Sequence, residues 1–360
     1  MNILVVTQKY DINDSNLGAF IGWWDKLAGK MEKIYILALE KHSESTLSNI
    51  EVLSMGKEKG VDFFGKILGF YIGLFKTIKH IDAILVHMIP KYVILAAPVA
   101  FIFRKPIYFW YTGVSANYDL RIAVKLCRKV FTAHEAAMRI STPKRIITGH
   151  GIDTSLFKIS NLSPRSSFGG AGKSQISTVT ILSVGRITPS KGHDLIIRTA
   201  AELIKSRYNI KLTIIGGIIQ NYHREYLKFL KELATNLQIN DKIEFLGDAT
   251  YDKMPFYLNQ SQILVNAVPF GGLDKAVLEA MASGVIPLTS NGAFLTVFPE
   301  KIATQLIFKE GDLKDLENKL RNITDKKLYQ DEELINELRN IVVKNHNLDH
   351  LISRIVEEIF

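Results

Sequence analysis

Two basic residues lie in a loop that follows an expected strand, which is where ligand-binding residues of a parallel α/β sheet are found. Arg186 and Lys191 follow an apolar run, TVTILSVG, on a short loop bounded by two glycines, and a helical stretch comes next. An arginine fork and a lysine point charge, together with loop amides, can clamp a diphosphate. A solvated basic turn would carry the same residues. The position directly after a strand favours the clamp.

A second motif is PFGGLDKAVLEAMASGVIP, residues 269–287. Gly271 and Gly272 let the backbone approach a ligand closely, and the helix start after them offers free N–H groups. Glu279, inside the helix, can accept two hydrogen bonds from a vicinal diol such as that of a ribose. An i,i+4 pair with Lys275 would explain the same carboxylate. Spacing alone leaves both interpretations open.

Apolar runs and amphipathic helical stretches alternate along the chain. Near-continuous apolar runs are typical of parallel strands covered on both faces, and they predict seven strands in the first half and five in the second. Helical stretches separate most of them, among them 193–207 and 221–237. The sequence therefore predicts two doubly wound α/β domains, whose ligands bind beyond the carboxyl ends of the strands.

The segment 160–177, SNLSPRSSFGGAGKSQIS, is rich in Ser and Gly and is interpreted as the linker. Its GGAGKS run is not a phosphate loop, because Ser167 replaces the required first glycine and the run precedes a strand. The predicted domains are 1–168 and 169–343. The final segment 344–360 is expected to form a helix that packs back on the first domain.

The positive charge lies in the first half of the chain. Of 360 residues with a net charge of +9, residues 1–175 carry 23 Lys/Arg against 13 Asp/Glu, whereas residues 176–360 carry 22 against 23. A basic domain suits an anionic membrane surface or a phosphorylated ligand. The alternative is that the charge difference between the two halves reflects drift in surface composition and has no functional role.

The segment 61–82 is expected to be a helix with two faces. Gly65, Gly69 and Gly73 align on one side, while aromatic residues and lysines are spread over the rest. It would either lie on anionic lipid as an interfacial helix or pack closely on the sheet through its glycines.

Several features predict a cytoplasmic protein, peripheral at the inner face of the membrane if the basic domain binds lipid. The single cysteine, Cys127, excludes an internal disulfide and is expected to be a small buried side chain. The N-terminal MNILVVTQKYD predicts a buried strand and lacks the features of a signal peptide. The longest apolar run, 92–103, is shorter than the roughly 20 residues of a membrane span.

The motifs together resemble a known family. VGRITPSKG, followed about ninety residues later by LDKAVLEAMASGVIP, is similar to the C-terminal signature of family-4 retaining glycosyltransferases of the GT-B fold. MNILVVTQKYDINDSNLGAF and IYFWYTG…KVFTA…RIITGHGIDTSLF resemble the matching first domain, so the resemblance covers nearly the whole chain. It implies two facing Rossmann-like domains, the second binding a nucleoside-diphosphate sugar and the first a saccharide or lipid-linked acceptor.

The resemblance also implies roles for individual residues. Arg186 and Lys191 would hold the donor diphosphate, and Glu279 the ribose. Gly18, in the first loop, would close over the phosphates from the other domain. The glycine turn would face the donor sugar and phosphate with Gly271, Gly272, Leu273 and Lys275.

Two departures from the family pattern concern catalysis. The family's first glutamate falls at Gly271, and we hypothesise that Asp274 or Lys275 contacts sugar or phosphate instead. The family's usual histidine falls at Gly113. His87 matches a position where related sequences carry a cleft histidine, so His87 and Asp274 are the catalytic candidates. A histidine after a strand can equally be structural, which is how His150 in TGHGID is interpreted, as holding the turn.

The predicted function is retaining transfer of a sugar from a nucleoside-diphosphate sugar, in cell-surface polysaccharide or lipopolysaccharide synthesis. No cofactor and no metal are expected, because no Asp-x-Asp run or metal-ligand spacing occurs, and no nucleic-acid partner is expected. An impaired sugar-nucleotide-binding partner protein and a GT-B sugar-nucleotide epimerase are the alternatives. A dinucleotide oxidoreductase is disfavoured, because the first strand is not followed by G-x-G-x-x-G.

Overall fold

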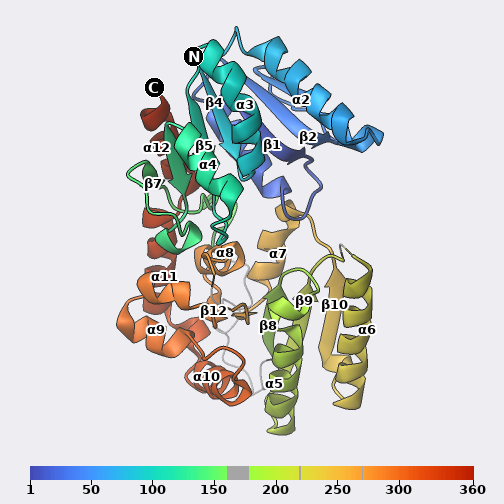
Figure 1. Ribbon diagram of the computed structural model, residues 1–360. Helices are drawn as coiled ribbons and strands as arrows, with labels where there is room; N and C mark the ends of the chain where they lie inside the picture. Colours follow the sequence, from blue (N-terminus) through green and yellow to red (C-terminus); the bar gives the residue numbers. More distant parts are fainter. Residues whose placement is uncertain (160–177, 219, 270) are drawn as a thin grey trace. The chain divides into compact units, whose positions relative to one another are not determined.

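The computed structural model describes residues 1–159, 178–218, 220–269 and 271–360, and it divides into two compact units (Figure 1). Unit 1 contains Met1–Gly151 and His346–Phe360, and unit 2 contains Ile152–Asn345. Each unit is built on one parallel sheet with flanking helices, as the alternating pattern predicts. The predicted linker 160–177, with its GGAGKS run, lies outside the described residues.

Unit 1 has a seven-stranded parallel sheet in the order β3-β2-β1-β4-β5-β6-β7. Its strands are β1 (Asn2–Tyr10), β2 (Lys33–Lys41), β3 (Ile50–Ser54), β4 (Ala83–His87), β5 (Ile107–Trp110), β6 (Lys129–Thr132) and β7 (Arg145–Ile147). Its helices are α1 (Ile21–Ala28), α2 (Phe63–Thr77), α3 (Pro90–Ile102), α4 (Tyr118–Leu126) and α12 (Leu348–Ile359).

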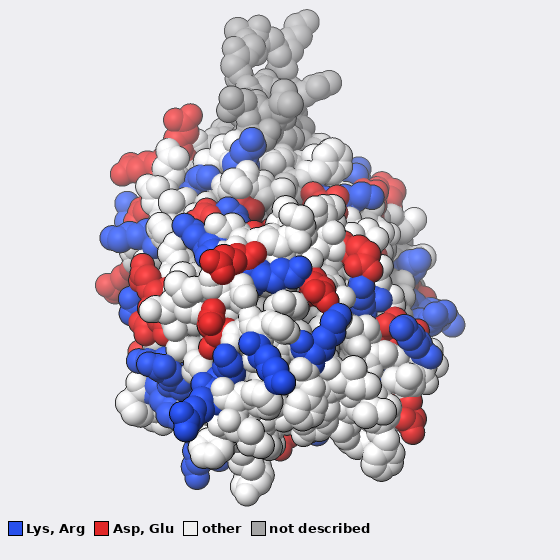
Figure 2. Space-filling view, turned by 90° about the horizontal axis from the view of Figure 1, so that it is seen from above, with Lys and Arg blue, Asp and Glu red and all other residues white. Residues whose placement is uncertain are grey.

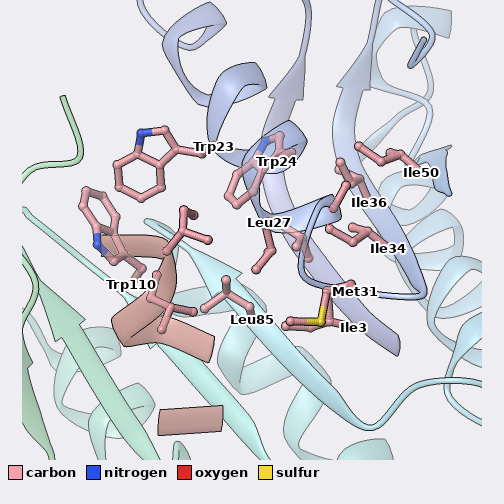
Figure 3. Close-up of a cluster of buried hydrophobic side chains, with 14 of the residues drawn as sticks. Ile3, Trp23, Trp24, Leu27, Met31, Ile34, Ile36, Ile50, Leu85 and Trp110 are labelled. Atoms are coloured by element: carbon pink, nitrogen blue, oxygen red, sulfur yellow. The ribbon is translucent and has the colours of Figure 1, made fainter. Parts of the chain in front are cut away.

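The side chains of β1 alternate between two buried faces of this sheet. Ile3 and Val5 belong to one hydrophobic cluster, which α1 and α12 cover, and Leu4 and Val6 belong to a second, which α2, α3 and α4 cover. Figure 3 shows α1 directing Trp24 and its neighbours toward the strands of the first cluster. Because both faces are buried, the strands read as continuous apolar runs.

Helix α2 packs on the sheet through its glycines, as one of the two sequence interpretations predicts. A Cβ at Gly69 would lie 2.7 Å from the carbonyl oxygen of Met55, and one at Gly73 would lie 2.5 Å from Cδ1 of Leu37. A larger residue at Gly69 would collide with the backbone of Met55, and one at Gly73 would require the Leu37 side chain to shift. The opposite face of α2 is exposed.

Unit 2 has a five-stranded parallel sheet in the order β10-β9-β8-β11-β12. Its strands are β8 (Val179–Val184), β9 (Ile210–Ile215), β10 (Ile243–Gly247), β11 (Ile263–Asn266) and β12 (Ile286–Thr289). Its helices are α5 (His193–Lys205), α6 (Asn221–Asn236), α7 (Met254–Asn259), α8 (Lys275–Ala282), α9 (Glu300–Leu306), α10 (Leu313–Asp325) and α11 (Glu332–Asn345).

The units divide between Gly151 and Ile152, whereas the sequence analysis places the boundary at 168/169. The residues just after the division belong with unit 2 because Arg339 of α11 donates hydrogen bonds to the carbonyl oxygens of Thr154 (3.1 Å) and Phe157 (2.9 Å). The chain returns to unit 1 at His346.

Helix α12 completes unit 1 at the chain's C-terminal end. It packs on α1, and the Tyr108 hydroxyl donates to the carbonyl oxygen of Ile359 at 3.2 Å. Lys26 Nζ lies 2.7 Å from Asp349 Oδ1. Within the described ranges, every helix falls short of the length and apolar content that a membrane span requires.

Candidate functional site

The basic loop predicted from the sequence follows β8 and leads into α5 of unit 2. Gly192 turns its backbone, with a φ of +63°, and a Cβ at this position would lie only 2.7 Å from Cβ of Ala267. Glycine therefore lets the loop lie against the residue that follows β11. Lys191 ends the short 3-10 helix Pro189–Lys191, one residue before this turn.

His193, the first residue of α5, fixes the same loop from inside. Its Nε2 lies 3.2 Å from the carbonyl oxygen of Arg186, and its Nδ1 lies 3.2 Å from Oγ of Ser183. A carbonyl can only accept, so Nε2 carries the hydrogen and Nδ1 accepts from the serine hydroxyl. Burial lowers the pKa of His193, so the ring stays neutral. The Arg186 side chain is exposed.

Lys191 and Asp274 form an ion pair across 83 residues of sequence, with Nζ 3.0 Å from Oδ2. Asp274 also caps α8, because its Oδ1 accepts from the N–H of Ala276 at 3.1 Å. Burial would raise the pKa of Asp274, but the charge of Lys191 and the hydrogen bonds from Lys191, Ala276 and Asn266 hold it below its usual value. The carboxylate is therefore ionised at neutral pH.

Helix α8 begins later than the sequence analysis expects, which places the start of the helical stretch directly after the glycine turn. Helix α8 begins at Lys275, because Asp274 has extended backbone and serves as the N-cap. Gly272 and Leu273 consequently lie in the loop before the helix. Their proposed contact with donor sugar and phosphate stays a prediction.

Glu279 is 5% exposed and lies on α8 inside unit 2. Burial raises its pKa to about 7, although the charge of Lys275 and a hydrogen bond from Tyr251 both act to lower it. The Nζ of Lys275 lies 5.4 Å from the centroid of the Tyr251 ring. The pKa of Tyr251 is raised well above its usual value, first by burial and then by the charge of Glu279. The structure thus brings three polar side chains together at one buried point.

Asn291 anchors the glycine turn from the end of β12. Its Nδ2 donates to the carbonyl oxygen of Gly272 at 2.8 Å, and its Oδ1 accepts from the N–H of Ala293 at 3.0 Å. The neighbouring Ser290 hydroxyl donates to the carbonyl oxygen of Val268 at 2.9 Å. The loop after β11 is therefore positioned by two residues that follow β12.

Tyr251, His193 and Asn291 are polar site residues that the sequence analysis missed. His193 had one available signal, because it stands directly between the basic loop and the helix. Tyr251 and Asn291 come from the loops after β10 and β12, and sequence spacing does not relate either loop to Glu279 or the glycine turn.

The assembled site suits a ligand with two kinds of group. The carboxyl ends of β8 and β11 present a lysine, an exposed arginine and a loop of backbone amides, which suit phosphates. The buried carboxylate of Glu279 suits hydroxyl donors, because a desolvated acceptor is stabilised by each hydrogen bond that it receives. In the described part of the chain, no three His, Cys, Asp or Glu side chains are grouped as metal ligands.

His87, a catalytic candidate from the sequence, lies in unit 1 and is 1% exposed. Its ring centroid is 4.2 Å from that of Phe20 and 5.4 Å from those of Trp24 and Trp110. Its Nδ1 lies 3.1 Å from Oγ1 of Thr7. These contacts give the ring a packing role in the core, and its catalytic role stays a prediction.

The other notable residues of unit 1 are Gly18, His150 and Gly113. Gly18 begins the 3-10 helix Gly18–Phe20, and its N–H donates to the carbonyl oxygen of Asp14 at 2.9 Å. His150 is buried, with its ring centroid 6.4 Å from that of Trp110. Its interpretation as a residue that holds the turn stays a prediction, as does closure of Gly18 over phosphates.

Gly113, where the family resemblance expects a histidine, is crowded by a tyrosine. The hydroxyl of Tyr111 lies 2.3 Å from where a Cβ at position 113 would be. That hydroxyl is held 2.8 Å from Oγ of Ser115. A side chain at 113 therefore requires Tyr111 to move.

Cys127 is buried, as predicted, and its thiol donates to the carbonyl oxygen of Val124 at 3.4 Å. Burial raises its pKa to about 11. The thiol is thus neutral and unreactive at ordinary pH.

Comparison with known proteins gives matches for both the sequence and the fold. Residues 173–345 match the family Glycosyl transferases group 1. GDP-Man:Man(3)GlcNAc(2)-PP-Dol alpha-1,2-mannosyltransferase of Dictyostelium discoideum is 30% identical over 120 residues, covering 31% of this chain and 24% of that protein. A GDP-mannose-dependent monoacylated alpha-(1-6)-phosphatidylinositol monomannoside mannosyltransferase of Corynebacterium glutamicum is 33% identical over 160 residues, covering 41% and 39%. The matched segments therefore span well under half of these relatives.

Among solved structures, HepE of Anabaena in complex with UDP and glucose superposes with a TM-score of 0.78 at 17% identity, covering 100% of this chain and 99% of that one. At this identity the likeness establishes the fold, which is that of the GT-B glycosyltransferases. Residues 173–345, which lie in unit 2, therefore resemble Glycosyl transferases group 1, and the chain as a whole has the GT-B fold.

Proposed function

We propose that this protein is a retaining glycosyltransferase that moves a sugar from a nucleoside-diphosphate sugar to a saccharide or lipid-linked acceptor. The observation that carries the proposal is the arrangement of Lys191, Asp274 and Glu279 at the carboxyl ends of the strands in unit 2, within a domain that matches the family. Two of its relatives are named as mannosyltransferases.

Each proposed contact with the donor follows from the chemistry of the side chain. Arg186 and Lys191 bind the diphosphate, and Asp274 holds Lys191 in place before the donor arrives. Glu279 accepts hydrogen bonds from the ribose hydroxyls, with Tyr251 keeping its carboxylate oriented. The amides of Gly272 and Leu273 face the sugar and the phosphate.

In the proposed reaction, the acceptor hydroxyl attacks the anomeric carbon on the face that the diphosphate leaves. The bond from that carbon to the diphosphate oxygen breaks, a bond to the acceptor oxygen forms, and the diphosphate takes the hydroxyl proton. Arg186 and Lys191 stabilise the negative charge that develops on the leaving group, so no metal ion is needed.

The proposed setting is the cytoplasmic side of a membrane, in the assembly of cell-surface polysaccharide or lipopolysaccharide. Two relatives carry a lipid in their names, a dolichol diphosphate and a phosphatidylinositol mannoside. The basic N-terminal domain suits an anionic membrane surface.

A thermal-shift screen of UDP, GDP, ADP, TDP and CMP sugars tests donor binding. A ligand present at 100 times its Kd stabilises the protein by about 2.7 kcal/mol. We expect one nucleotide class to stabilise the wild type, and Lys191→Met and Glu279→Gln to lose that shift. Lys211→Met and Glu317→Gln are the matched controls, because they remove an ion-paired lysine and a buried carboxylate elsewhere in unit 2.

Product analysis then separates the alternative functions. Donor that stabilises the protein but is never turned over would indicate a binding partner protein, and conversion of the donor sugar without an acceptor would indicate an epimerase. Proton NMR of the glycoside formed, in the presence and absence of EDTA, tests retention and metal independence together. Inverted configuration, or loss of activity in EDTA, would contradict the proposal.

A further inference from the structure

Unit 1 carries a row of exposed apolar side chains that its core does not use. We call it the α2–α3 ridge. Its members are between 56% and 87% exposed: Phe63, Phe64, Leu68, Ile72 and Phe75 on α2, and Phe101 and Ile102 on α3. Residues 64, 68, 72 and 75 recur at helical spacing and so share one face of α2. Exposed apolar side chains that gather in this way, unlike single ones, mark an interaction surface.

The two helices of the ridge lie side by side in unit 1, as Figure 1 also shows. The hydroxyl of Tyr71 on α2 donates to the carbonyl oxygen of Leu95 on α3 at 3.3 Å. The rings of Phe70 and Tyr92 stack with their centroids 6.1 Å apart. Since both helices bury their other faces against the sheet, the ridge is the outer surface of one helical layer.

The same layer is strongly basic. Between Phe63 and Arg128 the chain has nine Lys/Arg residues and only two Asp/Glu residues. One of the two acids, Asp82, accepts from the N–H of Asn2 at 2.8 Å, and the other, Asp119, lies 3.9 Å from Lys91. Among the nine cations, Lys76 also lies 2.8 Å from Glu51, which belongs to β3.

The cations cluster at one edge of the layer. Helices between parallel strands run antiparallel to them, so the C-terminal ends of α2, α3 and α4 all lie at the amino edge of the sheet. These ends carry Phe75 and Phe101 together with Lys76, Lys79, Arg104, Lys105, Lys125 and Arg128. Figure 2, which looks from above, shows Lys and Arg among white side chains in its lower part, with few Asp or Glu.

We infer that the α2–α3 ridge docks on the surface of an anionic lipid bilayer, with its aromatic and aliphatic side chains entering the interface and its cations facing lipid phosphates. Helices of 15 and 13 residues can lie in the interface, whereas a span requires about 20. Complementary charge selects the bilayer over a protein partner, because the cores of protein interfaces are depleted in lysine.

This inference goes beyond sugar transfer and does not depend on it, because the ridge lies in unit 1 and contains none of the proposed donor contacts. A transferase docked on a membrane would encounter lipid-linked acceptors as they diffuse within the plane of that membrane. Binding to vesicles requires neither donor nor acceptor, so the failure of either proposal can be recognised separately.

The test is sedimentation of the full chain with vesicles of phosphatidylcholine alone and with vesicles containing 30% phosphatidylglycerol. We expect binding only to the anionic vesicles, and loss of binding as salt rises. A charge variant, Lys79→Glu with Lys125→Glu, should bind at least about 25-fold more weakly, because each lost cation contributes roughly fivefold and each added carboxylate is repelled by the anionic surface. An apolar variant, Phe75→Ser with Phe101→Ser, should weaken binding at least tenfold.

Matched controls come from exposed residues of unit 2. Phe229→Ser with Phe256→Ser removes two phenylalanines that are 43% and 60% exposed, and Lys228→Glu with Lys301→Glu makes the same charge change. Both controls should bind vesicles as the wild type does. All variants should keep the wild-type melting temperature and its shift with nucleotide sugar, which excludes misfolding as the cause of lost binding.

Equal binding of the wild type to both kinds of vesicle overturns the inference, and so does binding by either ridge variant within twofold of the wild type. If the wild type binds neither kind of vesicle, the inference fails and an acidic protein becomes the partner to search for.

Discussion

At the carboxyl end of β4 in unit 1, His87 lies among the rings of Phe20, Trp24 and Trp110. At the carboxyl ends of β8 and β11 in unit 2, the comparable space holds Lys191 paired with Asp274. Both sheets are parallel and both edges are where ligands of this architecture bind. One edge has been filled by aromatic packing and the other has retained desolvated charge. Equivalent positions in a fold therefore do not indicate equivalent chemistry.

The largest expected effect tests the aromatic edge. Trp23→Ala removes a buried ring whose centroid lies 4.8 Å from that of Trp110, and we expect it to lower the free energy of unfolding by about 3–5 kcal/mol. Urea denaturation followed by far-UV circular dichroism measures the loss. Donor affinity of the folded variant should stay unchanged. A large fall in donor affinity without a fall in stability would contradict the assignment of a packing role to the aromatic edge of unit 1.

The next effect is a pH dependence at the charged edge. The pKa of Glu279 is about 7 in the folded protein and about 4.5 for an ordinary glutamate, so the folded state binds more protons between these values. Stability from this group is therefore fully present below pH 4.5 and is lost as pH rises through 7, by about 3 kcal/mol. Melting temperatures of the wild type and Glu279→Gln across pH 4–8 should diverge accordingly.

Glu317→Gln is the control for that experiment. Glu317 is also buried, but its hydrogen bond from Arg321 lowers its pKa, so its contribution is present above the unfolded pKa and is lost as pH falls. The control should therefore leave the wild-type slope between pH 5 and 7 intact. A slope that survives in Glu279→Gln would show that another group titrates there.

A smaller effect comes from the ion pair. Lys191→Met leaves the carboxylate of Asp274 without its cation, and we expect the unfolding free energy to fall by about 2 kcal/mol and donor affinity to fall about 100-fold. Adding Asp274→Asn should restore most of the stability but none of the affinity. Recovery of affinity in the double variant, measured by calorimetry, would mean that Lys191 serves only to neutralise its partner.

The smallest effect concerns the glycine turn. Asn291→Ala removes the hydrogen bond that positions Gly272 and the one that Asn291 accepts from Ala293, and we expect a loss of about 1 kcal/mol in stability and a rise of about fivefold in donor KM. Ser115→Ala removes a hydrogen bond of Tyr111 in unit 1 and should leave KM unchanged. Steady-state kinetics on both variants decide whether the two edges differ in function as well as in composition.

The sequence predicted the strands and most helices because burial on both faces leaves a local signal. NILVVTQ lies within β1, and TVTILSVG spans β8. The helical stretch 221–237 matches α6 to within one residue. The division of the structure into units differs from the predicted boundary, since the assignment of residues 152–158 depends on Arg339, far along the chain.

Sequence reasoning could name individual candidate residues of the site, but it could not show which of them lie together in space. Arg186, Lys191 and Glu279 follow from local motifs and the resemblance. The Lys191–Asp274 pair requires β8 and β11 to be neighbours, and that strand order is a property of the whole sheet. The burial of His87 likewise depends on where α1 packs, which no motif in the sequence encodes.

The cluster in unit 1 has a practical consequence for spectroscopy. The chain contains three tryptophans, and all of them, Trp23, Trp24 and Trp110, belong to this one cluster. Intrinsic tryptophan fluorescence therefore reports on unit 1 alone, while unit 2 contributes only tyrosine emission. Unfolding curves recorded by tryptophan emission therefore give the stability of unit 1 without any label, and a tryptophan response to a nucleotide sugar would reveal that unit 1 senses the occupancy of unit 2.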